Sequence, residues 1–112
     1  MANDYSTATK NAMVDAMVAR GRYYSIHSAN PSGTGANEVS TARQLMTFPS
    51  ASAGSAQGST VAIAMPTGAT AAYFGVWDAL TGGNYIRGGT LPGTSVFGAP
   101  GTLGLSDLLV WT

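Results

Sequence analysis

The chain has 112 residues, no cysteine, a formal net charge of zero and only 9% charged residues. The lack of cysteine excludes disulfides and thiolate metal ligands, and the five basic residues form no patch of the kind that binds nucleic acid. The sequence predicts a single soluble domain over residues 1–112, without a leader peptide or an apolar run of the roughly 20 residues that cross a membrane. Globular domains usually carry about 25% charged residues, so we expect copies of the chain or other subunits to cover much of this surface.

One helix is predicted, over residues 6–20. Ser6 or Thr7 can cap its start, and Gly21 stands where such a helix ends. Most of its circumference is apolar, more than the stripe of about 100° that one core requires. Two interpretations remain open: the helix is buried deeply beneath a sheet, or it packs against a neighbouring subunit. The second predicts an oligomer or capsid interface at Ala12, Met13, Ala16, Met17 and Ala19.

Residues 22–112 predict a β-rich sandwich, because short alternating segments are separated by glycine and proline turns. In the first segment, Tyr24 and Ile26 should share one face, with Tyr23 and His27 on the other. The Ser/Ala/Gly tract at 50–59 is interpreted as a flexible loop or an extended arm. The predicted fold class is mainly β, an antiparallel β-sandwich or jelly-roll-like domain with one N-terminal α-helix. Strands are expected at 22–28, 42–48, 60–65 and 103–111, with a loop at 29–40.

The stretch at 72–91 predicts a long hairpin that organises the rest of the domain. It holds many of the bulky aromatic residues, and its Gly82-Gly83-Asn84 segment supplies the positive φ angles of a tight turn. Tyr73, Gly75 and Trp77 should lie on one face, and Phe74, Val76 and Asp78 on the other. Pro92-Gly93 is expected to break the chain again.

Little in the sequence indicates catalysis. His27 is the single histidine, so a general base would have to be His27, with Glu38, Asp78 or Asp107 as its partner. No Gly-x-Ser-x-Gly motif surrounds any serine, and a structural hydrogen bond is the favoured role of His27. Asp78 is expected to close the hairpin turn or to pair with Arg87. We predict no catalytic, cofactor-binding or metal-binding residues, no cofactor and no enzyme activity.

Two stretches resemble a known family. The first is Ser-Ile-His-Ser-Ala-Asn-Pro-Ser-Gly-Thr-Gly-Ala-Asn-Glu-Val-Ser at 25–40, followed by Ala-Arg-Gln at 42–44. The second is Phe-Gly-Val-Trp-Asp-Ala at 74–79, followed by the glycine pairs at 82–83 and 88–89. Both are similar to segments of small structural proteins of tailed bacteriophage virions. The resemblance implies a β-rich, oligomer-forming virion component, described in some cases as a minor tail or fibre protein and in others as a capsid decoration or minor capsid protein.

The leading functional hypothesis is a capsid decoration or minor capsid protein that stabilises the shell. It implies a virion protein, made in the host cytoplasm, that binds itself (possibly as a trimer) and the major capsid protein or tail proteins, but no nucleic acid or membrane. The alternative is a minor tail or fibre protein that binds host-surface glycans, with Tyr23, Trp77 and Tyr85 as an aromatic platform. An enzyme such as a cell-wall hydrolase comes last, because paired carboxylates and a metal site are missing.

Overall fold

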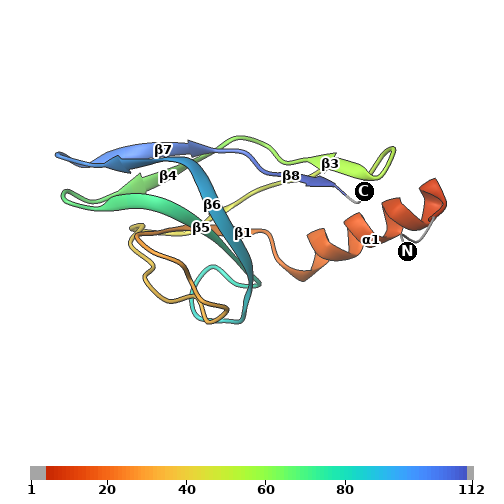
Figure 1. The fold of residues 1–112 in the computed structure, drawn as a ribbon, viewed down its shortest axis with the longest axis horizontal. Helices are drawn as coiled ribbons and strands as arrows, with labels where there is room; N and C mark the ends of the chain where they lie inside the picture. Colours follow the sequence, from red (N-terminus) through yellow and green to blue (C-terminus); the bar gives the residue numbers. More distant parts are fainter. Residues whose placement is uncertain (1–4, 111–112) are drawn as a thin grey trace.

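A computed structural model describes residues 5–110, and within this range the chain forms one helix followed by eight strands (Figure 1). The strand pairs are antiparallel, which confirms the prediction of a mainly β, antiparallel domain with an N-terminal helix. Trp111, predicted to end the last strand, lies outside the described residues. The elements are α1 (Thr7–Arg20), β1 (Tyr23–His27), β2 (Gln44–Leu45), β3 (Ser55–Gln57), β4 (Val61–Met65), β5 (Thr70–Trp77), β6 (Tyr85–Val96), β7 (Gly101–Leu105) and β8 (Leu108–Val110).

The strands are arranged as one four-stranded sheet, in the order β2-β1-β5-β6, and two ribbons, β4–β7 and β3–β8. The core lies between the four-stranded sheet and the β4–β7 ribbon. Tyr24, Ile26 and Val76 from the sheet pack against Ile63 and Met65 from the ribbon. The alternation predicted for β1 is confirmed. Tyr24 and Ile26 lie on the core face of the sheet, and Tyr23 and His27 lie on the opposite face. We call this opposite face, which carries Tyr23, His27, Tyr73 and Trp77, the outer face.

The predicted hairpin is present, but β6 does not stop at Pro92. It continues to Val96, and its pairing with β5 jumps from Tyr73↔Thr90 to Ala71↔Ser95. Pro92 lies inside this irregular stretch of an edge strand, where its missing N–H costs no ladder bond. The expected chain break is therefore wrong, because the sequence does not show which strand lies at the edge of the sheet.

Three other segments also differ from expectation, each because of its pairing partner. The segment at 42–48 forms only the short strand β2, because only two of its residues, Gln44 and Leu45, pair with β1. The tract at 50–59 is neither a free loop nor an arm, because β3 within it pairs with β8. The apolar segment at 103–111 divides between β7 and β8, which pair with different strands.

The helix begins as predicted, with the Ser6 hydroxyl accepting a hydrogen bond from the Thr9 backbone N–H. It is not buried beneath the sheet, however: Val14 is its one buried residue, and the helix projects from the strands beside the β3–β8 ribbon (Figure 1). Asn11 and Asp15 fix it there by accepting hydrogen bonds from the backbone N–H groups of Gly54 and Ala51. The deep-burial interpretation is therefore wrong, because the β4–β7 ribbon already covers the core face of the sheet.

Gly21 follows the helix as predicted, but its role is close packing. Its backbone is extended, with φ −173°. A Cβ atom at this position would lie 2.8 Å from the Trp77 carbonyl oxygen and 2.9 Å from Ile86 Cγ1. Glycine therefore lets the end of α1 pass directly against the hairpin.

Candidate functional site

The two stretches that carry the family resemblance meet on the outer face of the four-stranded sheet. The loop that follows β1 returns alongside the end of β1, where Ser28 N–H donates to the Asn37 carbonyl and Val39 N–H to the Ile26 carbonyl. A Cβ atom on Gly35 would collide with the Trp77 ring. Hydrogen bonds within the first motif and close packing of Gly35 on Trp77 of the second motif therefore hold the loop against the sheet.

Beneath the loop, three side chains form a buried chain of hydrogen bonds. Trp77 Nε1–H donates to Ser25 Oγ at 2.8 Å, and Ser25 Oγ lies 2.7 Å from His27 Nε2. His27 Nδ1 lies 2.7 Å from the Ala36 carbonyl oxygen, which can only accept, so Nδ1 carries the proton and Nε2 accepts from Ser25. Each polar atom has a partner when the imidazole is neutral. Ser25 and His27 are 0% exposed, and Trp77 is 8% exposed.

The Ser25–His27 contact has the length of a nucleophile–base pair, but its surroundings differ from those of a catalytic triad. The ring nitrogen of His27 that would face an acid bonds a backbone carbonyl. The three acids considered from the sequence bond elsewhere: Glu38 to Arg43, Asp78 to Asn84, and Asp107 to Arg87 and Tyr24. Burial also separates the serine from solvent. The geometry therefore gives His27 a structural role.

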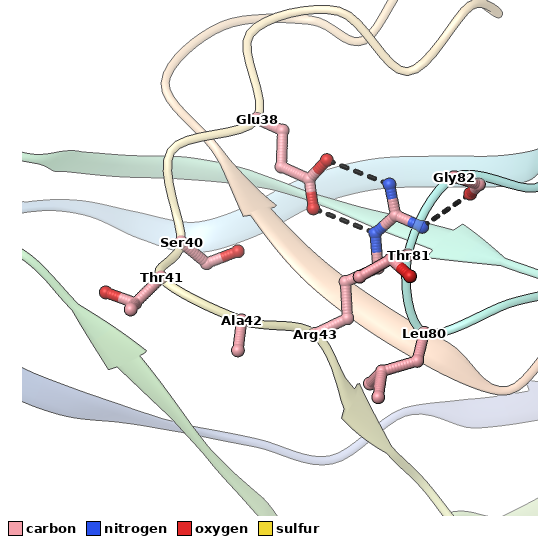
Figure 2. Close-up of a pocket in the computed structure, with 8 residues that line it drawn as sticks. All are labelled: Glu38, Ser40, Thr41, Ala42, Arg43, Leu80, Thr81 and Gly82. Carbon is pink, nitrogen blue, oxygen red and sulfur yellow. Dashed lines mark hydrogen bonds and ion pairs between the residues drawn. The ribbon is translucent and has the colours of Figure 1, made fainter.

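Arg43 stacks on the Trp77 ring of this network. Its guanidinium carbon lies 3.6 Å from the Trp77 ring centroid, a cation–π distance. Its Nε and Nη2 donate to the two carboxylate oxygens of Glu38 at 2.9 and 3.0 Å, and its Nη1 donates to the Gly82 carbonyl at 2.7 Å (Figure 2). Nη1 also donates to the Ala79 carbonyl at 3.0 Å. One side chain thus joins the loop, the sheet and the hairpin turn.

The hollow beside Arg43 has a volume of about 310 Å³ and includes Ser40, Thr41 and Leu80 in its lining (Figure 2). Four of the five guanidinium N–H groups of Arg43 donate to Glu38 and the turn carbonyls. We therefore assign the arginine to structure. Sequence reasoning quoted Arg43 within the first motif but gave it no role, since its partners are 5 to 39 residues away.

The two other acids considered above also act within the fold. Asp78 closes the hairpin turn as predicted, because its carboxylate accepts from the Asn84 backbone N–H at 2.7 Å and from Asn84 Nδ2 at 3.0 Å. These hydrogen bonds hold the pKa of Asp78 below its usual value. Arg87 pairs instead with Asp107, which also accepts from the Tyr24 hydroxyl at 2.6 Å. Burial raises the pKa of Tyr24, and the hydrogen bond to Asp107 adds to this effect.

The three aromatic residues proposed as a glycan platform do not form one exposed surface. Trp77 lies beneath Arg43, so its ring face is covered. Tyr23 is half-buried, and Tyr85 packs edge-on against Trp77 with the ring centroids 5.5 Å apart. Tyr85 also lines an open groove of about 420 Å³ together with Tyr73, which sequence reasoning did not place in a site.

The five helix residues proposed as an interface lie on two faces of α1. Ala12, Ala16 and Ala19 are exposed on the side of the helix opposite the buried Val14. Met13 and Met17 line an apolar groove of about 230 Å³ with Leu109 and Val110 of β8. These residues therefore form two separate apolar surfaces, neither of which belongs to the core.

Two negative findings concern residues 5–110. No group of three or more histidine, aspartate or glutamate side chains is placed to hold a metal ion in this range. Its helix is also not long and apolar enough to cross a membrane.

A family model described as "Podophage GP4 fiber I protein gp80" matches residues 4–97. The match covers most of the chain and includes both motifs. The chain belongs to this phage fibre protein family. This confirms the resemblance to small structural proteins of phage virions and implies a virion component. The family fits the fibre alternative better than capsid decoration. No curated protein matches the chain.

The hydrogen-bond chain predicts a large effect for Ser25→Ala. The substitution leaves the Trp77 indole N–H and His27 Nε2 buried without their shared partner, and each such loss costs about 1–3 kcal/mol. We expect the free energy of unfolding, measured by urea denaturation, to fall by about 2–4 kcal/mol. The control is Ser28→Ala, which changes an exposed serine three residues along and should alter stability by less than about 0.5 kcal/mol. Equal effects of both substitutions would contradict the network.

Burial lowers the pKa of His27 below its usual value of about 6.5. Between the two pKa values the unfolded chain binds more protons than the folded chain, so stability falls as the pH decreases below about 6.5 and levels off below the folded-state pKa. Urea denaturation at several pH values between neutral and mildly acidic measures this slope. His27→Gln, which removes the titrating group, should lack this contribution to the slope even if it is less stable throughout. Parallel pH profiles of the two proteins would refute the assignment.

Proposed function

We propose that the protein is a non-catalytic structural subunit of a phage virion fibre and that it works as a homo-oligomer. The family match over residues 4–97 carries this proposal. The local chemistry supports a structural role, because the groups that could perform catalysis bond one another or the backbone. His27, Arg43 and Asp78 stabilise the loop and turn that the two motifs form.

The exposed alanine face of α1 supports assembly with further copies. Thr9, Ala12, Ala16 and Ala19 follow the 3-4-3 spacing of a coiled-coil seam and are all exposed. Small side chains allow close approach of neighbouring helices. Apolar residues of α1 and of β8 are also exposed to solvent, with Met17 40%, Leu108 52% and Val110 49% exposed. We propose a symmetric oligomer, with a trimer as the expected form, that joins other tail proteins.

Copy number in purified virions distinguishes the fibre role from capsid decoration. We expect few copies per particle relative to the major capsid protein, measured by quantitative mass spectrometry, and immunogold label at the tail or its attachment region. The matched reference is the major capsid protein in the same preparation. A copy number close to that of the capsid subunit, with label over the shell, would restore capsid decoration. Absence from particles would refute both roles.

A charge on the alanine face should disrupt the oligomer. Ala16→Glu places a carboxylate in the proposed seam, so we expect dissociation to monomers with an unchanged circular dichroism spectrum. Sedimentation velocity on the full chain measures the state. Thr7→Glu is the matched control, because Thr7 is also exposed on α1 but lies about half a turn around the helix from Ala16. If Ala16→Glu sediments like the unchanged chain, this surface is not the interface.

Binding of a host-surface glycan is the second candidate function. The observation that favours it is the open groove beside Tyr85 and Tyr73. Its chemistry leads to a more specific inference.

A further inference from the structure

The largest of the open grooves described above, about 420 Å³, lies over the outer face of β6. One part of its lining comes from the loop that follows β1, through Asn30, Pro31 and Gly33. The rest comes from Tyr73 of β5 and residues 85–90 of β6. This volume is within the range of about 300–1,000 Å³ of small-molecule sites. Residues of both motifs take part in the lining, and Arg43 does not.

Gly88 leaves part of the groove floor without a side chain of its own. On the outer face, Tyr73 pairs with Thr90 and Gly75 with Gly88. The Ser25 and His27 side chains occupy the space over Gly75, which is not part of the lining. A Cβ atom on Gly88 would collide with the Tyr85 hydroxyl, so the Tyr85 side chain lies over this glycine. The β6 backbone and the Tyr85 side chain therefore form part of the floor, and the paired residues Tyr73 and Thr90 continue the lining.

The polar groups of the groove are available for a ligand. The hydroxyls of Tyr73, Tyr85 and Thr90 make no hydrogen bond to any residue in the described range 5–110. Asn30 uses its Oδ1 atom to accept from Ser32 N–H, which leaves its Nδ2 donors unused within the same range. β6 is also an edge strand, so part of its backbone N–H and C=O groups points away from β5.

The groove carries no free charge. Arg87 is the one ionisable cation in its lining, and the guanidinium donates to Asp107 and Tyr24 on the core side of the sheet. An anionic ligand would therefore find no uncompensated cation. Aromatic rings beside hydroxyl and amide groups suit a ligand with C–H faces and many hydroxyls.

We propose that this groove binds a neutral saccharide, with a sugar ring against Tyr73 and its hydroxyls bonded to Asn30, Thr90 and the β6 edge. The inference rests on the proposed fibre role for its biological setting, where the sugar would belong to the host surface. The binding chemistry itself depends only on the groove.

The test is an NMR titration of the ¹⁵N-labelled full chain with neutral disaccharides: lactose, maltose, cellobiose and N,N′-diacetylchitobiose. Sialyllactose serves as the charged comparison. At least one neutral sugar should shift the amide signals of Asn30, Ser32, Gly33 and residues 85–90 and leave those of α1 unchanged. Tyr73→Leu should weaken that binding by about tenfold, the loss expected for one aromatic contact. Thr90→Val should weaken it too, while Thr102→Val, the same change at an exposed position on β7, should not.

Three outcomes would overturn the inference: no shifts in the groove for any probe up to the solubility of the sugar, equal affinity of Tyr73→Leu and the unchanged chain, or stronger binding of sialyllactose than of lactose. Concentration-dependent shifts of the groove residues without sugar, and none with it, would replace the saccharide by a second copy of the chain. Virion copy number is independent of this titration. If the chain binds sugar but is absent from particles, the fibre role is refuted and the inference that the groove binds a saccharide still holds.

Discussion

The stacking of Arg43 on Trp77 is the interaction on which the rest of the outer face depends. The indole is covered by the guanidinium on one face and donates through its N–H to Ser25, which in turn bonds His27. Because the same arginine binds Glu38 and two carbonyls of the hairpin turn, it holds the long loop and the turn in one arrangement. A buried polar network of this kind is stabilising only when every member has a partner. Here the neutral imidazole completes it.

Most of the acidic residues of this chain make contacts that hold parts of the fold together. Glu38 and Asp107 each pair with an arginine, and Asp78 and Asp15 accept backbone N–H bonds. These uses account for four of the five acidic residues of the sequence. The surface is poor in charge and carries open apolar patches on α1 and β8, which suits a protein whose surface is covered in an assembly.

The Ser25–His27 pair shows why a short serine–histidine distance alone does not identify an enzyme. A nucleophile must reach its substrate, and its base must be oriented by a third group that stabilises the imidazolium. In this chain the serine is buried beneath a tryptophan, and the third group is a neutral carbonyl. The same hydrogen bonds that would activate a nucleophile in an open cleft here fix a loop that borders the groove at Tyr73 and Tyr85.

The sequence by itself determined the elements whose signals are local. Alternation along β1 placed Tyr24 and Ile26 in the core, Ser6 marked the start of α1, and the glycines before Asn84 marked the turn that Asp78 closes. Only the tertiary structure decided which segments pair and what covers each face. In the folded chain α1 lies outside the core, and β6 continues past Pro92. The 50–59 tract pairs with β8, and Arg43 stacks on Trp77. Periodicity and turn chemistry depend on neighbours within a few residues, whereas a strand's partner, a sheet edge and the residue stacked on an indole depend on segments that meet only when the chain folds.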